Sequence, residues 1–255
     1  MPKVIPNKIY KYRSYTEIHF KIITKQELYF ARPSEFSDLQ DCKYRINRDA
    51  VKNETNRRKT YARLFKIDDL FDPIINEHIE SNPITDELID KIEEARQIEN
   101  DKYLGIFSAS ESYSNRYLWN VFAANHTGFC VGIDYSQISQ GIGLNGSIKY
   151  SDTGLPETKV YNYEESEFIE YLYNSLMTLK DELSQEREYR LSKIIINDLD
   201  RFHKIPKCSI SEIFLGKNMA DDKKKELIKL IKENLSSTKI FSIIEKDGDL
   251  EGIRV

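Results

Sequence analysis

Two glutamates separated by one residue, Glu186 and Glu188, form the pattern in this 255-residue chain that most directly suggests chemistry. From Glu186 onward the sequence has a period of two, which predicts a strand with Glu186, Glu188 and Arg190 on one face. Carboxylates held close together raise the cost of ionising both, a common way to obtain an acid or a base. Arg190 would oppose this effect, and a solvated, charged strand edge is the alternative interpretation.

An arginine and two serines are the next candidates. Arg13 follows Tyr12 in an aromatic segment near the N-terminus; its guanidinium suits a phosphate or carboxylate, and Tyr12 could stack on a ring. In the FSAS segment, Ser108 and Ser110 project from the same side of an extended chain and could hold a ligand. Ordinary strand surface and a serine-capped turn are the alternatives.

The single tryptophan and one of four histidines form the last grouping. A short helix is predicted to begin after Ser114 or Asn115, and its 3.6-residue repeat places Trp119 and His126 on one side together with Phe122. The pair could be a ligand-stacking wall or supply a general acid/base. A buried histidine with satisfied ring nitrogens is an equally good interpretation.

Helices and strands must alternate to position these side chains. The first ~50 residues have the aromatic alternation of short strands and turns. Residues 50–102 are highly charged and predict a helical insertion or layer, including an amphipathic helix after Thr85 with Leu88, Ile89 and Ile92 on one face.

The second half predicts further elements in order. These are a buried strand in GFCVGID, a helix over 163–184, the strand SEIFLG, a helix beginning at Asp221 or Asp222, the strand KIFSIIE and a DG turn. No linker or repeat divides the chain. The sequence therefore predicts one α+β domain over residues 1–255, with mixed or antiparallel sheets and flanking helices.

Composition excludes several classes of protein. The net charge of −4 argues against nucleic-acid binding by bulk electrostatics. Three distant cysteines and four histidines without ligand spacing predict neither a disulfide framework nor a metal site. The absence of a long apolar run and of a secretory signal predicts no membrane association and a cytoplasmic location.

Taken in order, the segments YKYRS, LYFARPSEFSD, GIFSASESYSNRYLWNVFAANHTGFCVGID, IKYSD, LKDELSQEREYRL and SEIFLG resemble a bacterial family, domain of unknown function twenty-nine seventy-one. That family's pattern combines an aromatic-Lys-Tyr-Arg opening, a core containing W and H-x-G, and a late E-x-E-x-R. The resemblance spans nearly the whole chain and implies one domain, but it supplies no activity.

A second resemblance suggests a mechanism. The order of Arg13, the FSAS segment and Glu186-Arg187-Glu188 is similar to the Arg, S-T-S and E-x-E elements of one class of ADP-ribosyltransferases. The resemblance implies that Arg13 binds the phosphates of NAD, that Ser108 supports the site, and that Glu188 stabilises the cationic ribose while Glu186 orients the acceptor.

The leading hypothesis is therefore an NAD-dependent ADP-ribosyltransferase or NAD glycohydrolase, acting as a bacterial toxin or antiviral effector. Tyr12, Ser110, Trp119, His126 and Arg190 would complete the NAD site, and the partners would be NAD, a macromolecular acceptor and a possible regulatory protein.

Two other hypotheses remain open. One is a nuclease or phosphodiester hydrolase that uses Asp38, His126 and Glu188. The other is a non-catalytic ligand- or protein-binding module in which the charged helix at 85–100 supplies the interface.

Overall fold

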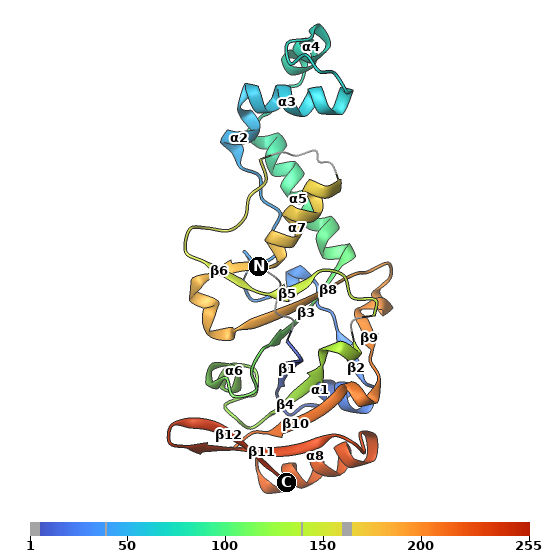
Figure 1. Ribbon diagram of the computed structural model, residues 1–255, viewed down its shortest axis with the longest axis vertical. Helices are drawn as coiled ribbons and strands as arrows, with labels where there is room; N and C mark the ends of the chain where they lie inside the picture. The colour runs from blue at the N-terminus through green and yellow to red at the C-terminus, as the bar shows by residue number, and fades with distance from the viewer. Residues whose placement is uncertain (1–5, 39, 139, 160–164) are drawn as a thin grey trace.

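An eight-stranded sheet forms the body of the protein in a computed structural model that describes residues 6–38, 40–138, 140–159 and 165–255 (Figure 1). Its strands lie in the order β12-β11-β10-β4-β1-β3-β8-β5. They are β1 (Lys8–Arg13), β3 (Leu104–Ser110), β4 (Phe129–Asp134), β5 (Asn145–Ser147), β8 (Glu188–Ile194), β10 (Ile210–Leu215), β11 (Lys239–Lys246) and β12 (Asp249–Arg254). Within the sheet β10 and β11 pair in parallel, and the other neighbours are antiparallel.

Two small sheets and a set of helices complete the described fold. The small sheets pair β2 (Glu27–Tyr29) with β9 (Phe202–Lys204), and β6 (Lys149–Ser151) with β7 (Thr178–Lys180). The helices are α1 (Glu17–Thr24), α2 (Arg48–Lys52), α3 (Glu54–Phe65), α4 (Pro73–Ser81), α5 (Asp86–Tyr103), α6 (Arg116–Val121), α7 (Glu165–Leu176) and α8 (Asp221–Asn234). The predicted α+β class with a mixed sheet and flanking helices is therefore confirmed.

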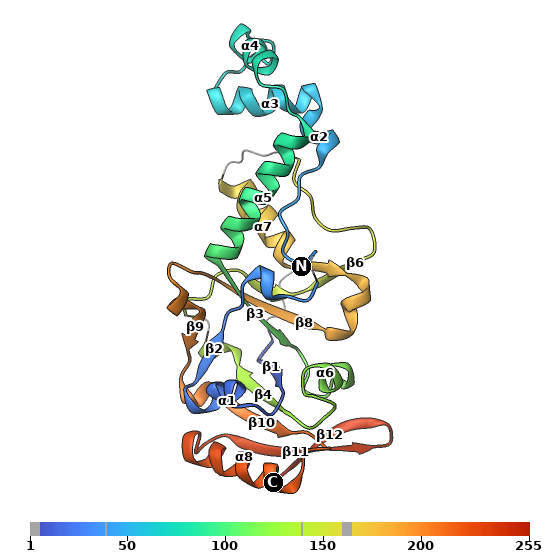
Figure 2. The same ribbon diagram turned by 180° about the vertical axis from the view of Figure 1, so that it is seen from behind.

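Both faces of the large sheet are covered, because strand side chains alternate between them. On one face Ile9 and Phe107 belong to the main core, which also contains Ile23 of α1 and Leu227 of α8. On the other face Tyr12 packs with residues of α6. Figure 2 shows α1 and α6 on opposite sides of β1.

The sheet is weakly joined between β1 and β3. These strands share one residue pair, Tyr10 with Ser110, whereas β1 and β4 pair at six positions from Lys8 to Arg13. Next to that pair, the ammonium of Lys11 on β1 donates to the backbone carbonyl of Ser108 on β3.

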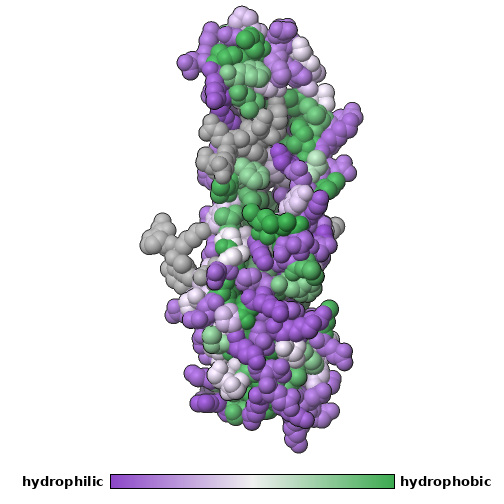
Figure 3. Space-filling view, turned by 90° about the vertical axis from the view of Figure 1, so that its right-hand side faces the viewer, coloured by the Kyte–Doolittle hydropathy of each residue, from purple (hydrophilic) through white to green (hydrophobic). Residues whose placement is uncertain are grey.

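A helical projection extends from one end of the sheet. In Figure 1, α3 and α4 lie farthest from α8, and α5 connects them to β3. Two small apolar clusters hold this part together: Tyr44, Ile46, Val51, Ile89 and Tyr171 in one, and Tyr61, Ala62 and Ile75 in the other. On the face in Figure 3, apolar side chains gather over the upper and middle parts, and the lower part is mostly hydrophilic.

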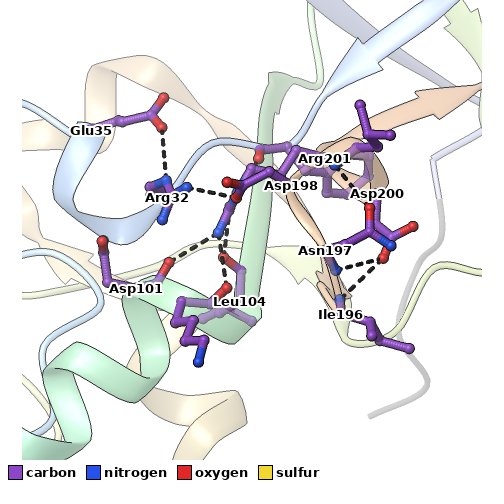
Figure 4. Close-up of polar contacts among 12 residues, drawn as sticks. Arg32, Glu35, Asp101, Leu104, Ile196, Asn197, Asp198, Asp200 and Arg201 are labelled. Atoms are coloured by element: carbon purple, nitrogen blue, oxygen red, sulfur yellow. Dashed lines mark hydrogen bonds and ion pairs between the residues drawn. The ribbon is translucent and has the colours of Figure 1, made fainter.

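A buried arginine fixes the junction between α5 and the sheet (Figure 4). Arg201 donates from one terminal nitrogen to the carbonyls of Phe30 and Leu104, and from the other to those of Asp101 and Lys102. The last carbonyls of a helix carry partial negative charge, so a guanidinium placed there satisfies and stabilises the helix end.

Several predicted elements are confirmed. The structure contains helices through residues 50–102, the strands β4, β10 and β11, the helix α8 from Asp221, and a left-handed turn at Asp247-Gly248. The predicted N-cap Asn115 accepts a hydrogen bond from the backbone of Leu118.

Other predictions were wrong. Helix α1 lies where only strands and turns were expected, and Leu88 is 41% exposed whereas Ile89 is buried. The helix predicted over 163–184 ends at Leu176 and is followed by β7 and a 3-10 helix at Asp181–Glu186; residues 163 and 164 lie outside the described part. Helix α6 ends at Val121, so His126 lies beyond it.

Candidate functional site

One small pocket collects most of the residues singled out by the sequence. Tyr12, Ser108, Ser110, Glu186 and Glu188 line a depression of about 30 Å³, together with Tyr10, Lys11, Ala109, Leu118 and Phe122. They come from β1, β3, the end of the 3-10 helix at Asp181–Glu186, the start of β8, and α6 with the residue after it. Because β3 and β8 are neighbours in the sheet and β1 lies next to β3, the FSAS and Glu-x-Glu motifs meet Tyr12 at one place.

Glu188 belongs to a buried network of charges. Its carboxylate accepts hydrogen bonds of 2.6 and 3.1 Å from Arg190, which also donates bonds of 2.8 and 2.6 Å to Asp41. A further bond from Arg190 reaches the carbonyl of Leu176, and all three charged side chains are at most 6% exposed. One guanidinium between two carboxylates satisfies their charges where water cannot, and this fixes the position of Glu188.

Glu186 does not lie in a strand, although the sequence predicted one there. It ends the 3-10 helix at Asp181–Glu186, and Arg187 adopts a left-handed conformation, with φ of 46°, before β8 begins at Glu188. Glu186 and Glu188 therefore do not share one strand face, although Glu188 and Arg190 do. The reversal at Arg187 nevertheless brings both glutamates to the same pocket.

The two glutamates differ in their electrostatic environment. Burial, and then the negative charge of Glu188, raises the pKa of Glu186 from 4.5 to about 7, while Arg190 and Lys11 oppose the rise. Unlike Glu188, Glu186 has no ion-pair partner among the described residues. A carboxyl group that titrates near neutral pH can accept or release a proton during a reaction.

Polar contacts hold the loop that carries Glu186. The Ser110 hydroxyl donates to the carbonyl of Glu186 at 3.1 Å, and the Asn115 amide donates to the carbonyl of Gln185 at 2.6 Å. The Tyr12 hydroxyl accepts from the backbone of Asn115 at 3.0 Å. Sequence reasoning expected Asn115 only as a possible helix cap, and its contact with the loop depends on tertiary structure.

Lys11 is a functional candidate that sequence reasoning missed. Its ammonium donates to the carbonyl of Ser108 and lies 5.1 Å from the centre of the Phe107 ring. Burial, and then the positive charge of Arg13, holds the pKa of Lys11 well below its usual value. In the sequence, Lys11 lies between Tyr10 and Tyr12, and a lysine in that position is indistinguishable from an ordinary solvent-exposed residue of a strand.

Trp119 and His126 stand behind this pocket rather than in its lining. Their rings stack at 5.5 Å, and Tyr12 meets the Trp119 ring edge-on at 5.2 Å. The Trp119 indole donates to the carbonyl of Tyr113, and burial lowers the pKa of His126. This pair thus supports the wall formed by Tyr12. His126 is buried as the structural interpretation expected, but its Nδ1 has no hydrogen-bond partner among the described residues, so its ring nitrogens are not both satisfied.

Arg13 lies elsewhere. Because it is one residue from Tyr12 in a strand, its side chain projects from the opposite face of the sheet. It lines a second pocket, of about 500 Å³, with Phe107 and residues of α1 and β2. The structure therefore brings Ser108 and Glu188 together but does not add Arg13 to them.

Residues proposed for metal-assisted cleavage do not converge. Glu188 lines the small pocket, whereas His126 is stacked on Trp119 and Asp38 caps the backbone of Gln40. Within the described ranges, no three His, Cys, Asp or Glu side chains are grouped as they would be around a metal ion.

Comparisons with protein-family models, curated proteins and solved structures found no match to this chain. The described helices also include none with the length and apolar character needed to cross a membrane. Functional arguments therefore depend on the geometry of the two pockets.

Proposed function

We propose that this protein hydrolyses the N-glycosidic bond of NAD, with water as the acceptor. The observation that carries the proposal is the meeting of Glu186 and Glu188 in one pocket, where Glu188 is fixed by Arg190 and Glu186 has a pKa of about 7. Of the three motifs in the resemblance to ADP-ribosyltransferases, FSAS and Glu-x-Glu meet at this pocket, whereas Arg13 lines the other one, so the proposal depends on the glutamates and assigns no role to Arg13.

In the proposed reaction, the bond between ribose C1′ and the nicotinamide nitrogen breaks, and its electron pair leaves with neutral nicotinamide. The ribose then carries positive charge, which the fixed carboxylate of Glu188 stabilises more strongly than it stabilises the ground state. A water molecule attacks C1′ and gives its proton to Glu186, producing ADP-ribose.

The size of the pocket favours water over a macromolecular acceptor. A cavity needs roughly 10–15 Å³ to hold one water molecule. The pocket, at about 30 Å³, therefore has room for a nucleophilic water and little more. The ribosyl end of the substrate would lie across the mouth of the pocket, where Phe122 is 45% exposed. Hydrolysis of NAD would deplete a central metabolite, which suits a toxin or antiviral effector.

Release of nicotinamide from NAD by the purified protein tests the proposal. We expect Glu188→Gln to slow release by about 30- to 1,000-fold, corresponding to a loss of about 2–4 kcal/mol of transition-state stabilisation. Glu182→Gln is the matched control, because Glu182 is exposed on the same 3-10 helix.

The products distinguish the two forms of the reaction. Free ADP-ribose in an amount equal to nicotinamide supports hydrolysis, whereas ADP-ribose attached to protein or nucleic acid would show that the acceptor is a macromolecule. If the unsubstituted protein releases no nicotinamide, or if Glu188→Gln releases it as fast as Glu182→Gln does, the proposal is wrong.

A further inference from the structure

The pocket that contains Arg13 has the size and lining of a small-molecule site. Its volume of about 500 Å³ lies within the range of roughly 300–1,000 Å³ typical of ligand pockets. Ile22, Leu28 and Phe107 give it buried apolar walls, and Ile18, which is 66% exposed, lies at its edge. Ionisable side chains complete the lining and offer polar contacts to a ligand: Arg13, His19, Lys21, Glu27 and Glu35.

Arg13 is a charged group of this pocket without a partner among the described residues. Within the described part of the chain, no carboxylate or other acceptor lies within hydrogen-bonding or ion-pair distance of its guanidinium. Burial disfavours the charged form and lowers the pKa of Arg13 to about 10, although the residue remains partly exposed. A bound oxyanion would restore the missing interactions, and a planar guanidinium can hold it with two parallel bonds.

The surrounding charges favour one anionic group on the ligand. Lys11 is close enough to Arg13 for the positive charge of Arg13 to lower the pKa of Lys11, and Lys21 also lines the pocket. Burial and the charge of Arg13 lower the pKa of His19, which favours the neutral form of its ring. Glu27 and Glu35 line the pocket as well, and they disfavour a second anionic group.

We infer that this pocket binds a small organic anion, with one carboxylate or phosphate facing Arg13 and an apolar body against Ile22, Leu28 and Phe107. This site is separate from the proposed NAD site, because the two pockets share no lining residue. Lys11 lies between them: it lines the small pocket, and its ammonium stands over the ring of Phe107, which lines the large one.

Titration calorimetry with four probes tests this inference. Benzoate and phenyl phosphate combine an oxyanion with an apolar ring, whereas inorganic phosphate and benzyl alcohol each carry one of these features. We expect benzoate or phenyl phosphate to bind saturably and at least about tenfold more tightly than the last two, and their order distinguishes a carboxylate site from a phosphate site.

Two variants locate the binding. Arg13→Met should weaken the better probe at least about tenfold, whereas Arg254→Met, at an exposed arginine of β12, should leave it unchanged. If Arg13→Met fails to fold, Ile18→Glu at the exposed edge of the pocket should weaken the probe by repulsion.

Three results would overturn the inference: no saturable binding of either ring-bearing anion, equal binding to Arg13→Met and the unsubstituted protein, or nicotinamide release reduced as much by Arg13→Met as by Glu188→Gln. The last result would place Arg13 in the NAD site. Failure of NAD hydrolysis alone would leave the inference intact, because the binding assay does not depend on that reaction.

Discussion

Replacing Glu186 with glutamine tests the electrostatic account of the small pocket without reference to its function. The amide keeps the size of the side chain and removes its ability to ionise. In the folded protein the pKa of Glu186 is raised from 4.5 to about 7, so the folded state holds its proton more tightly than the unfolded state does. The contribution of this group to stability is present below about pH 4.5 and is lost as the pH rises through about 7.

The size of the effect follows from the shift in pKa. At about 1.4 kcal/mol for each pKa unit, the rise corresponds to an upper limit of about 3 kcal/mol. Glu186 is partly exposed, so solvent screening reduces the expected effect to about 1–3 kcal/mol. Relative to the unsubstituted protein, Glu186→Gln should therefore become more stable by this amount between about pH 5 and pH 8.

Urea denaturation of both proteins across this pH range measures the difference in free energy of unfolding. Glu182→Gln is again the control, and its difference from the unsubstituted protein should change by less than about 0.5 kcal/mol. The argument that burial and Glu188 destabilise the ionised side chain predicts that Glu186→Gln gains stability relative to the unsubstituted protein as the pH rises. A difference in free energy of unfolding that stays constant with pH, or a variant that becomes relatively less stable as the pH rises, would refute it.

Three further predictions concern the same region. Asp41→Asn should lower the free energy of unfolding by about 3–5 kcal/mol in urea denaturation, because it leaves the buried Arg190 short of one carboxylate; a loss below about 1 kcal/mol would contradict this. Gly128→Ala should destabilise the protein by at least about 2 kcal/mol in the same assay, since its Cβ would overlap the carbonyl oxygen of Arg13. In the proposed reaction, nicotinamide release should rise as the pH passes about 7 and Glu186 loses its proton, and Glu186→Gln should remove that step from the pH profile.

Local sequence patterns predicted many elements because their causes are local. The apolar run of β4, the Asp247-Gly248 turn and the N-cap at Asn115 depend on residues close together in the chain. The end of α7 at Leu176 did not follow from its apolar repeat. Leu179 fits a helical repeat, but it is buried in β7, so the repeat could not show that the helix ends before it.

For the candidate site, sequence order was informative but incomplete. It selected Ser108, Ser110, Glu186 and Glu188, which the fold brings to one pocket. Sequence order did not indicate Lys11. Its contact with Ser108 depends on the sparse pairing of β1 with β3, which is a property of the assembled sheet.

The sequence by itself determined the α+β class, most of the strands and the identity of the carboxylates, because these depend on residue type and short-range periodicity. Tertiary structure decided which side chains share a pocket. Arg13 and Tyr12 are adjacent in the chain yet line different pockets, since a strand alternates the direction of its side chains. Arg190 meets Asp41 across 149 positions of sequence, and only the folded sheet brings these charges together.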